Sequence, residues 1–271
     1  MVIEVGLPPR GEQVFTWRDD YLRPADPMTP TARTRLSLAD SWLLSNGRVR
    51  RIDLHRQRFL RGCAAVGSVS QETAAAFWQA AIGKLPKAGD WFPRVELPAE
   101  EPAELRLRVR PSPARSGPVT VWVPGTTDPR TAPHLKGPDL DALDALRGRA
   151  VARGAQEALL TTESGVVLEA GYASVLWWDK DWLCVPSPKL PVLGGVTTAV
   201  IQERAAQLGV PVGQRHVPVE ELEGKEVWLV NALHGIRPVR SWVGTSIRPG
   251  PALRAPEWQK WLAGESSEVR G

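Results

Sequence analysis

Lysine is rare in this chain, and one lysine stands where a ligand site could use it. The 271 residues include seven lysines, and arginine supplies the rest of the positive charge. Lys136, in PHLKGPDL, lies between an apolar residue and a Gly-Pro turn, a place where a loop points into a site. A desolvated lysine has a lowered pKa and becomes a nucleophilic amine suited to Schiff-base chemistry. The alternative is an ordinary loop lysine, since most lysines are exposed.

Three further segments carry groups that could hold an anion or a charged ring. In LPVLGGVTTAV two glycines permit close backbone approach, and free N–H groups at a helix start near Val196 and Thr197 form an anion site. Glu169 stands in the apolar run VVLEAGYASV, where a buried carboxylate needs a partner. Arg58 shares a helical face with His55 and could clamp a phosphate. A plain turn, an edge-strand acid and a solvated basic face are the respective alternatives.

The elements that position these groups follow from periodicity and turn residues. In the first half we expect strands over 35–45 and 49–54 joined at Asn46-Gly47, helices over 55–66 and 71–83, a proline-rich loop over 85–102, and strands over 104–113 and 119–123. In the second half we expect helices over 139–154, 197–209 and 255–264, a hairpin over 157–178 turned at Ser164-Gly165, and strands over 182–187, 226–233 and 235–244. We expect residues 1–35 to form a loosely structured N-terminal segment, the lead-in, and the C-terminal tail ESSEVRG to be disordered.

Mixed strands and helices in two unequal halves indicate an α/β or α+β architecture. We place the domain boundary in the turn-rich stretch that begins at Pro124. The expected domains are therefore an N-terminal α/β domain over 1–123 and a C-terminal domain over 124–271.

Composition excludes several classes of protein. A hydrophobic fraction of 42% and a charged fraction of 24% are ordinary for a globular enzyme, and no apolar run approaches the roughly 20 residues of a membrane helix. The N-terminus lacks the pattern of a secretory signal. Cys63 and Cys184 are far apart, which favours neither a disulfide framework nor a metal site. The basic residues are scattered rather than clustered, so we expect a cytoplasmic protein that binds a small molecule, with no nucleic-acid, membrane or metal partner.

The order of these groups resembles that of the class IV aminotransferase family. A basic residue on an early helix, Lys136 near mid-chain, Glu169 and a Gly-Gly-Val-Thr helix start follow one another in that family's sequence. The resemblance spans about Leu36 to Trp242 and is strongest over HLK, EALLTTESGVVLEAGYASVLWW, LPVLGGVTTAV and EVWLVNALHGIRPV. The family contains fold-type IV pyridoxal-phosphate enzymes such as branched-chain aminotransferase, D-amino-acid aminotransferase and aminodeoxychorismate lyase. The resemblance implies a small N-terminal α/β domain, a larger C-terminal pseudo-barrel domain and a homodimer.

The resemblance also implies a role for each candidate residue. Lys136 would hold pyridoxal 5'-phosphate as a Schiff base and remove the substrate α-proton. Glu169 would pair with the protonated pyridine nitrogen and so keep the ring an electron sink. The phosphate would be bound by residues from three segments: Arg58, Val196, Thr197, Asn231 and Ala232. The chain departs from the family pattern after Lys136, where GPDLD replaces the usual Tyr or Asn. It departs again at Ala232, which replaces a Thr, and at LADSWLL, which replaces Asp-Gly-x-Phe-Glu.

The resemblance leaves two reactions open. NALHGIRPV is similar to the corresponding segment of the lyases, and the lyase substrate carries two carboxylates that Arg110 and Arg237, with Arg108, could bind. A solvated sheet face is the alternative reading of the alternating arginines. We favour an aminodeoxychorismate lyase, which eliminates pyruvate to give 4-aminobenzoate. A class IV aminotransferase acting on a branched-chain or D-amino acid is the alternative, followed by a homologue that binds the cofactor without catalysis.

Overall fold

The computed structural model describes residues 11–25, 35–100 and 102–269. The chain forms two compact units. The first unit comprises residues 1–114, 135–138 and 266–271, and the second comprises residues 115–134 and 139–265. The sequence boundary at 123/124 lies after the strand Val119–Trp122, which the contacts assign to the second unit. The short segment that carries Lys136 belongs to the first unit, although its neighbours on both sides belong to the second.

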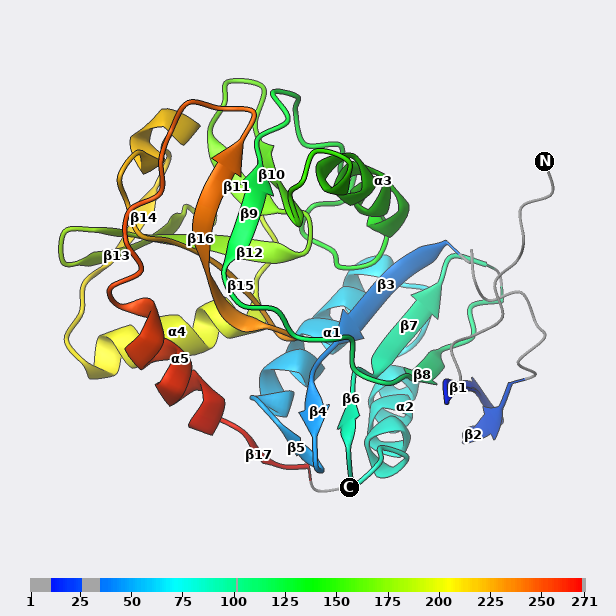
Figure 1. Ribbon diagram of the computed structural model, residues 1–271. Coiled ribbons are helices and arrows are strands. Elements are labelled where there is room, and N and C mark those ends of the chain that lie inside the picture. Colours follow the sequence, from blue (N-terminus) through cyan, green and yellow to red (C-terminus); the bar gives the residue numbers. More distant parts are fainter. Residues whose placement is uncertain (1–10, 26–34, 101, 270–271) are drawn as a thin grey trace. The chain divides into compact units, whose positions relative to one another are not determined.

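The first unit is built on an antiparallel sheet covered by two helices. Its strands follow the order β2-β1-β8-β7-β3, with bounds β1 Gln13–Arg18, β2 Tyr21–Pro24, β3 Leu36–Ser41, β7 Arg94–Pro98 and β8 Arg106–Val109. Helices α1 (Ile52–Val66) and α2 (Gln71–Gly83) pack together, and α1 lies on β3 (Figure 1). Apolar residues from one sheet face and both helices form the core, which is why these faces are buried.

A small sheet completes the first unit. Its strands follow the order β17-β5-β4-β6, with bounds β4 Leu44–Ser45, β5 Arg48–Val49, β6 Asp90–Trp91 and β17 Ser267–Glu268. Asn46 and Gly47 both have positive φ, of 47° and 73°. This is the backbone of a tight hairpin turn, and it confirms the predicted Asn-Gly turn.

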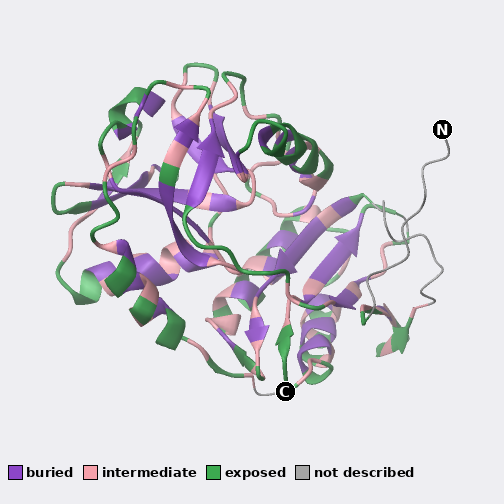
Figure 2. Ribbon diagram, viewed as in Figure 1, coloured by how far each residue is buried: buried purple, intermediate pink, exposed green. Residues whose placement is uncertain are grey.

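The second unit is a closed barrel with a two-strand extension. Its strands run in the order β11-β10-β9-β16-β15-β12, and a β11–β12 pairing closes the ring. The ring strands are β9 Val119–Trp122, β10 Glu157–Thr161, β11 Val167–Ala170, β12 Ala173–Asp179, β15 Val227–Asn231 and β16 Gly235–Val243. Strands β13 (Trp182–Pro186) and β14 (Val212–Arg215) extend the sheet beyond β12. Apolar residues of all six ring strands fill the interior (Figure 2).

Helices cover the outside of this barrel. α3 (Leu140–Val151) packs on β10 through a stripe formed by Leu143, Leu146 and Ala150. α4 (Val196–Gln207) packs on β15 and α5 (Ala255–Gly264) packs on β16 (Figure 1). The Arg204 guanidinium of α4 lies over the Trp261 ring of α5. A 3-10 turn at Val219–Leu222 follows β14. Across the residues that the structure describes, no helix is both long and apolar enough to cross a bilayer.

The mixed α/β class with a barrel is confirmed, but several predicted segments were wrong. The lead-in contains the hairpin β1–β2, while its residues 1–10 and 26–34 lie outside the described residues. The proline-rich loop contains β6 and β7, and the tail contains β17, which pairs with β5. The second strand of the Asn-Gly hairpin is short, because α1 already begins at Ile52. The predicted hairpin over 157–178 is three strands, and β14 was missed.

Candidate active site

Lys136 lies on a short loop that is fixed at its base and at its tip. At the base, the Asp139 carboxylate accepts hydrogen bonds from the backbone N–H groups of Thr131 and Ala132, both at 2.9 Å. At the tip, the carbonyl oxygen of Lys136 accepts a 2.6 Å bond from the N–H of Ala39 in β3. Gly137 has a φ of 133° and lies so close to β3 that an added Cβ would be 2.7 Å from the Ala39 nitrogen. The sequence Lys-Gly therefore lets the lysine backbone dock directly on a strand.

Arg58 is held by a buried aspartate that the sequence did not single out. Asp40, next to Ala39 in β3, accepts bonds from Arg58 Nε at 2.8 Å and Arg58 Nη2 at 2.7 Å. It also accepts a 2.8 Å bond from His55 Nδ1. The guanidinium that was predicted to bind phosphate is thus oriented by a bidentate ion pair. Because Ala39 and Asp40 are consecutive, one stretch of β3 holds both the Lys136 backbone and the Arg58 side chain.

The charges in this network support one another. Burial alone would raise the pKa of Asp40, but Arg58 and His55 together lower it well below the usual range of an aspartate. Burial lowers the pKa of His55, and the positive charges of Arg58 and Lys136 act in the same direction against the attraction of Asp40. The Nδ1–H of His55 donates to the aspartate, because the aspartate as an anion can only accept.

Glu169 points outward from the barrel in a row that crosses its strands. The register pairs Glu169 with Ser174 and pairs Ser174 with Val230. Directly paired residues share a face of a sheet, and neighbours along a strand alternate between faces. Ala170 and Ala173 are the neighbours of Glu169 and Ser174, and both lie in the barrel interior. Glu169 and Ser174 therefore face the outer side of the barrel, where α4 begins.

An arginine that the sequence analysis missed binds this glutamate. Arg130 Nη1 donates to Glu169 Oε2 at 2.6 Å, and the backbone N–H of Leu193 donates to the same oxygen at 2.8 Å. The hydroxyl of Ser174 is 3.4 Å from the other oxygen, Oε1. Burial raises the pKa of Glu169, and these donors only partly offset that effect. The carboxylate is thus fixed and almost completely buried, with Oε1 carrying only a long hydrogen bond among the described residues.

The start of α4 forms a tight cradle beside Ser174. A Cβ added to Gly195, the residue before the helix, would lie 2.6 Å from Ser174 Oγ, so a larger residue there would force the Ser174 side chain to move. The first N–H groups of a helix, here those of Val196 and Thr197, have no partner within the helix. The hydroxyl oxygen of Thr198 is buried without a hydrogen-bond partner in the described part of the chain. Buried polar atoms are rarely left unpaired, so this helix start fits an anionic group of a ligand.

The loop between β15 and β16 is folded around Asn231. Its Oδ1 accepts bonds from the N–H groups of Leu233 at 3.1 Å and His234 at 2.8 Å. Its Nδ2 donates to the carbonyl of Tyr172 at 3.0 Å, on the turn that follows Glu169. Asn231 therefore shapes the loop that carries Ala232. A direct contact of either residue with phosphate stays a prediction.

The arginines proposed for substrate carboxylates differ in their surroundings. Arg108 is buried and binds Glu96 at 3.0 Å and Glu12 at 2.6 Å, so its charge is already matched. Arg110 donates from Nε to the carbonyl of Phe92 at 3.0 Å and stacks on that ring, and no carboxylate of a described residue forms an ion pair with it. Burial, with a contribution from Arg94, lowers the pKa of Arg110 to about 10.

Arg237 lies on the other side of the barrel wall from Glu169. It pairs with Leu229, which belongs to the barrel interior, and its Nε donates to the carbonyl of Gly117 at 3.0 Å. Glu169 faces outward. The structure therefore does not bring Arg237 onto the face that carries the other candidate residues of this unit, and its contact with substrate stays a prediction.

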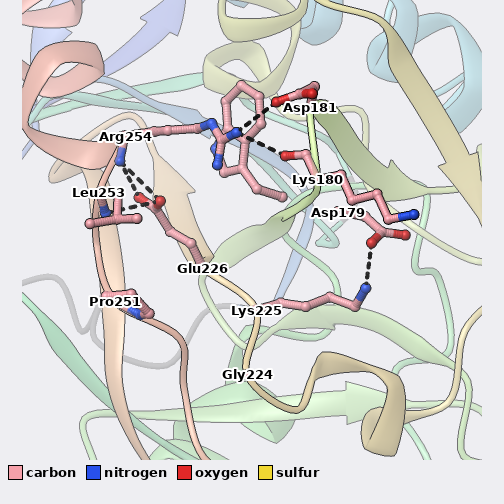
Figure 3. A pocket seen from close by; sticks show the side chains of 10 residues that line it. Asp179, Lys180, Asp181, Gly224, Lys225, Glu226, Pro251, Leu253 and Arg254 are labelled. Atoms are coloured by element: carbon pink, nitrogen blue, oxygen red, sulfur yellow. Dashed lines mark hydrogen bonds and ion pairs between the residues drawn. The ribbon is translucent and has the colours of Figure 1, made fainter.

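A pocket of about 380 Å³ lies near the β12–β13 turn, away from the candidate residues. Four of its charged side chains form two ion pairs, Lys225 with Asp179 and Arg254 with Asp181 (Figure 3). Lys225 binds Asp179 at 2.8 Å, and the Glu226 carboxylate accepts N–H groups at the start of α5, from Arg254 and Ala255. None of the predicted site residues lines this pocket, so it is a structural feature and not the site.

Comparison with known proteins decides the family. The family model described as amino-transferase class IV matches residues 37–242. The chain belongs to the class IV aminotransferase family. The match extends over nearly the same residues as the resemblance found in the sequence, from Leu36 to Trp242. The chain matches none of the curated proteins in sequence.

Solved structures of class IV enzymes share the fold of this chain. A fold IV-transaminase from Curtobacterium pusillum is 18% identical with a TM-score of 0.77, over 93% of this chain and 97% of its own. A hypothetical aminotransferase from Mycobacterium tuberculosis, in its α-ketoglutarate- and PMP-bound form, is 19% identical with a TM-score of 0.77, over 95% of this chain and 99% of its own. A putative 4-amino-4-deoxychorismate lyase from Legionella pneumophila is 18% identical with a TM-score of 0.71, over 84% of this chain and 90% of its own. These class IV proteins confirm the architecture, and the chemistry has to be argued from the residues.

Proposed function

We propose that this chain is a pyridoxal-phosphate enzyme in which Lys136 carries the cofactor. The observation that carries the proposal is the outward row of the barrel, where the buried Glu169 carboxylate stands beside the cradle at Gly195 and the unpaired Thr198 hydroxyl. Besides the lysine that attaches it, this cofactor needs a carboxylate to pair with its ring nitrogen and an anion site to bind its phosphate, and a helix start can supply that anion site. Arg58 and the loop at Asn231 and Ala232 would complete the phosphate contacts.

Bound pyridoxal phosphate supplies an electron sink, and the protein supplies attachment, orientation and proton transfer. Lys136 would attach the cofactor through its amine, and it would take the proton from the substrate carbon that bears the amino group. Glu169 would accept a hydrogen bond from the ring nitrogen and favour its protonated form. Arg58, held by Asp40, would neutralise phosphate charge. The Lys136 loop is fixed by Asp139 and Ala39, so the amine is held by a rigid backbone.

For the substrate we propose 4-amino-4-deoxychorismate, which loses pyruvate to become 4-aminobenzoate. Arg110 supports this proposal, because its half-buried guanidinium forms no ion pair with a carboxylate of the described residues and feels Glu12 and Glu96 only from farther away. A substrate with two carboxylates would supply a direct partner. The lyase-like segment NALHGIRPV supports the same choice.

An aminotransferase is the second candidate. It needs the same lysine and glutamate, and the similar protein from Mycobacterium tuberculosis holds α-ketoglutarate and PMP. In that reaction Lys136 would take up and return a proton so that the amino group is transferred, and no other bond of the substrate would break. The two reactions are separated by their products, pyruvate and 4-aminobenzoate in one case and a new amino acid in the other.

The first experiment tests attachment at Lys136. Purified protein loaded with pyridoxal phosphate is expected to show a visible absorption band, which borohydride reduction fixes to one peptide. Lys136→Ala should lose the band and all turnover, while the matched variant Lys189→Ala should retain both. Attachment at another lysine, or the absence of a band in the fully loaded wild type, would refute the proposal.

The second experiment tests the substrate. Incubation with 4-amino-4-deoxychorismate should release pyruvate, and Arg110→Gln should raise KM by about tenfold or more, because an ion-paired hydrogen bond is lost. Arg18→Gln, at an exposed ion pair of the same unit, serves as the control and should leave KM unchanged. A wild type that releases no pyruvate but transfers amino groups from amino acids to 2-oxoglutarate would establish the aminotransferase instead.

A further inference from the structure

We propose that Arg130 is a positioning residue, which fixes the Glu169 carboxylate as an anion with Oε1 directed to the ring nitrogen of the cofactor. This inference rests on the proposed function, since it gives Arg130 a task only when a pyridine ring is bound. It concerns a residue to which neither the sequence motifs nor the family resemblance gave a role.

Arg130 uses every nitrogen of its guanidinium. Nη1 donates to Glu169 Oε2 at 2.6 Å, and Nη2 donates to the carbonyl of Pro191 at 3.0 Å. Nε and Nη2 together grip Asp128 at 3.0 and 2.8 Å. The side chain is only 7% exposed, so these contacts hold it in one orientation. A planar fork with this many partners cannot be replaced by the point charge of a lysine.

The partners of Arg130 come from three parts of the second unit. Asp128 precedes the Lys136 loop, Glu169 lies on β11, and Pro191 precedes α4. A single side chain thus connects the base of the lysine loop, the ring-nitrogen carboxylate and the segment that leads to the phosphate cradle. Displacing it would move all three segments relative to one another.

The arrangement of donors leaves one glutamate oxygen for the ring. Oε2 receives Arg130 at 2.6 Å and the Leu193 N–H at 2.8 Å, and it is therefore saturated. Oε1 receives only the Ser174 hydroxyl at 3.4 Å among the described residues. A carboxylate oxygen accepts about two hydrogen bonds, so Oε1 has room for a short bond from a protonated nitrogen.

Formal charge points to the same ligand. The carboxylates of Asp128 and Glu169 both pair with the single guanidinium of Arg130, and the buried Asp139 also lies within reach of its charge, so negative charge is in excess around Glu169. A protonated ring nitrogen would balance it. Burial raises the pKa of Glu169 even with Arg130 present, so removing the guanidinium would favour the neutral acid, which no longer stabilises a protonated ring.

The test compares two ligands on the full chain. Pyridoxal phosphate has the ring nitrogen, and 1-deazapyridoxal phosphate carries carbon in its place. We expect Arg130→Gln to weaken binding of pyridoxal phosphate by about tenfold or more, as for a lost charged hydrogen bond, while binding of the deaza compound changes by less than about twofold. Arg153→Gln, in which an exposed arginine of the same unit is removed, should leave both affinities unchanged.

A second readout and a second variant keep the test decisive. The visible band of bound pyridoxal phosphate should titrate at a higher pH in Arg130→Gln, because a ring nitrogen that has lost its proton withdraws fewer electrons and leaves the nitrogen that links Lys136 to the cofactor more basic. If that variant does not fold, Asp128→Asn, which loosens the fork while keeping Arg130, should shift the titration in the same direction. Equal weakening of both ligands, or a titration curve identical to wild type, would overturn the role of Arg130. A wild type that binds neither ligand would refute the proposed function itself.

Discussion

Each unit contains a buried ion pair between an arginine and an acid. In the first unit the arginine is the predicted ligand-binding residue, and in the second unit the arginine holds the predicted ligand-binding residue. In the first unit Asp40 grips Arg58, the residue predicted to bind phosphate. In the second unit Arg130 grips Glu169, the residue predicted to bind the ring nitrogen. In both units the residue predicted to bind the ligand belongs to a motif, and the residue that holds it has the opposite charge and comes from elsewhere in the chain. Each predicted ligand-binding charge is thus positioned by a counter-charge.

The two pairs differ in how complete they are. Asp40 receives Arg58, His55 and the N–H of Ser41, and its pKa is lowered. Glu169 receives one arginine, a backbone N–H and a long hydroxyl contact, and its pKa is raised by burial. The first network is satisfied within the protein. The second lacks one positive charge, which is the charge that a protonated ring would bring.

Removing Asp40 should produce the largest loss of stability. Asp40→Ala leaves the charge of Arg58 without its counter-ion in a buried place, and such losses cost roughly 3–5 kcal/mol. Urea denaturation of the cofactor-free protein measures the change. The control is Asp53→Ala. Asp53 lies on α1, the helix that carries Arg58, and forms an exposed ion pair with Arg51, so its removal should cost about 1 kcal/mol or less. If both variants lost the same free energy of unfolding, the Asp40 network would stabilise the protein no more than an exposed ion pair does.

The partners of these charged residues were not predictable from the sequence, although the residues themselves were. Arg58 and Glu169 stand in family patterns, and Lys136 stands before a Gly-Pro turn. Asp40 and Arg130 meet them across 18 and 39 residues, and these contacts exist only once the strands are paired. An acid inside the buried strand LSLADSW was a usable signal, because such an acid requires a partner. Arg130, in a polar turn, gave no comparable signal.

The same distinction applies to the fold. The Asn46-Gly47 turn, the end of α1 before Gly67 and the start of α2 after Ser70 are set by local backbone requirements. The predicted turn and the predicted helices over 55–66 and 71–83 agree with all three positions. Strands β6 and β17 have two residues each, and β7 lies in a stretch interrupted by prolines. All three are stabilised by pairing with segments that are distant in sequence. Local patterns carry no information about such partners, so these strands were missed.

Acidification should affect the two acids in opposite directions. The pKa of Asp40 is lowered on folding, so its stabilisation is present above the unfolded value of about 3.9 and is lost as the pH falls through the folded pKa. The pKa of Glu169 is raised, so stability falls as the pH rises from about 4.3 through the folded pKa. Asp40→Asn should flatten the acid limb of the stability curve of the cofactor-free protein, and Glu169→Gln should remove the decline above about pH 4.3. Slopes that change in the same direction in both variants would contradict the comparison.

The smallest expected effect is that of removing the Ser70 helix cap, which should lower stability without changing the spectrum of the bound cofactor. Ser70 caps α2 through a 3.0 Å bond from the Thr73 N–H and contacts neither network. Ser70→Ala should lower the free energy of unfolding by about 1 kcal/mol, and Ser70→Asp should restore most of it, because aspartate is also a good cap. Both variants should keep the visible band of bound pyridoxal phosphate and its pH titration unchanged. If Ser70→Ala alters that band, the band reports stability in general, and a spectral change in Arg130→Gln would no longer identify a group that acts on the ring.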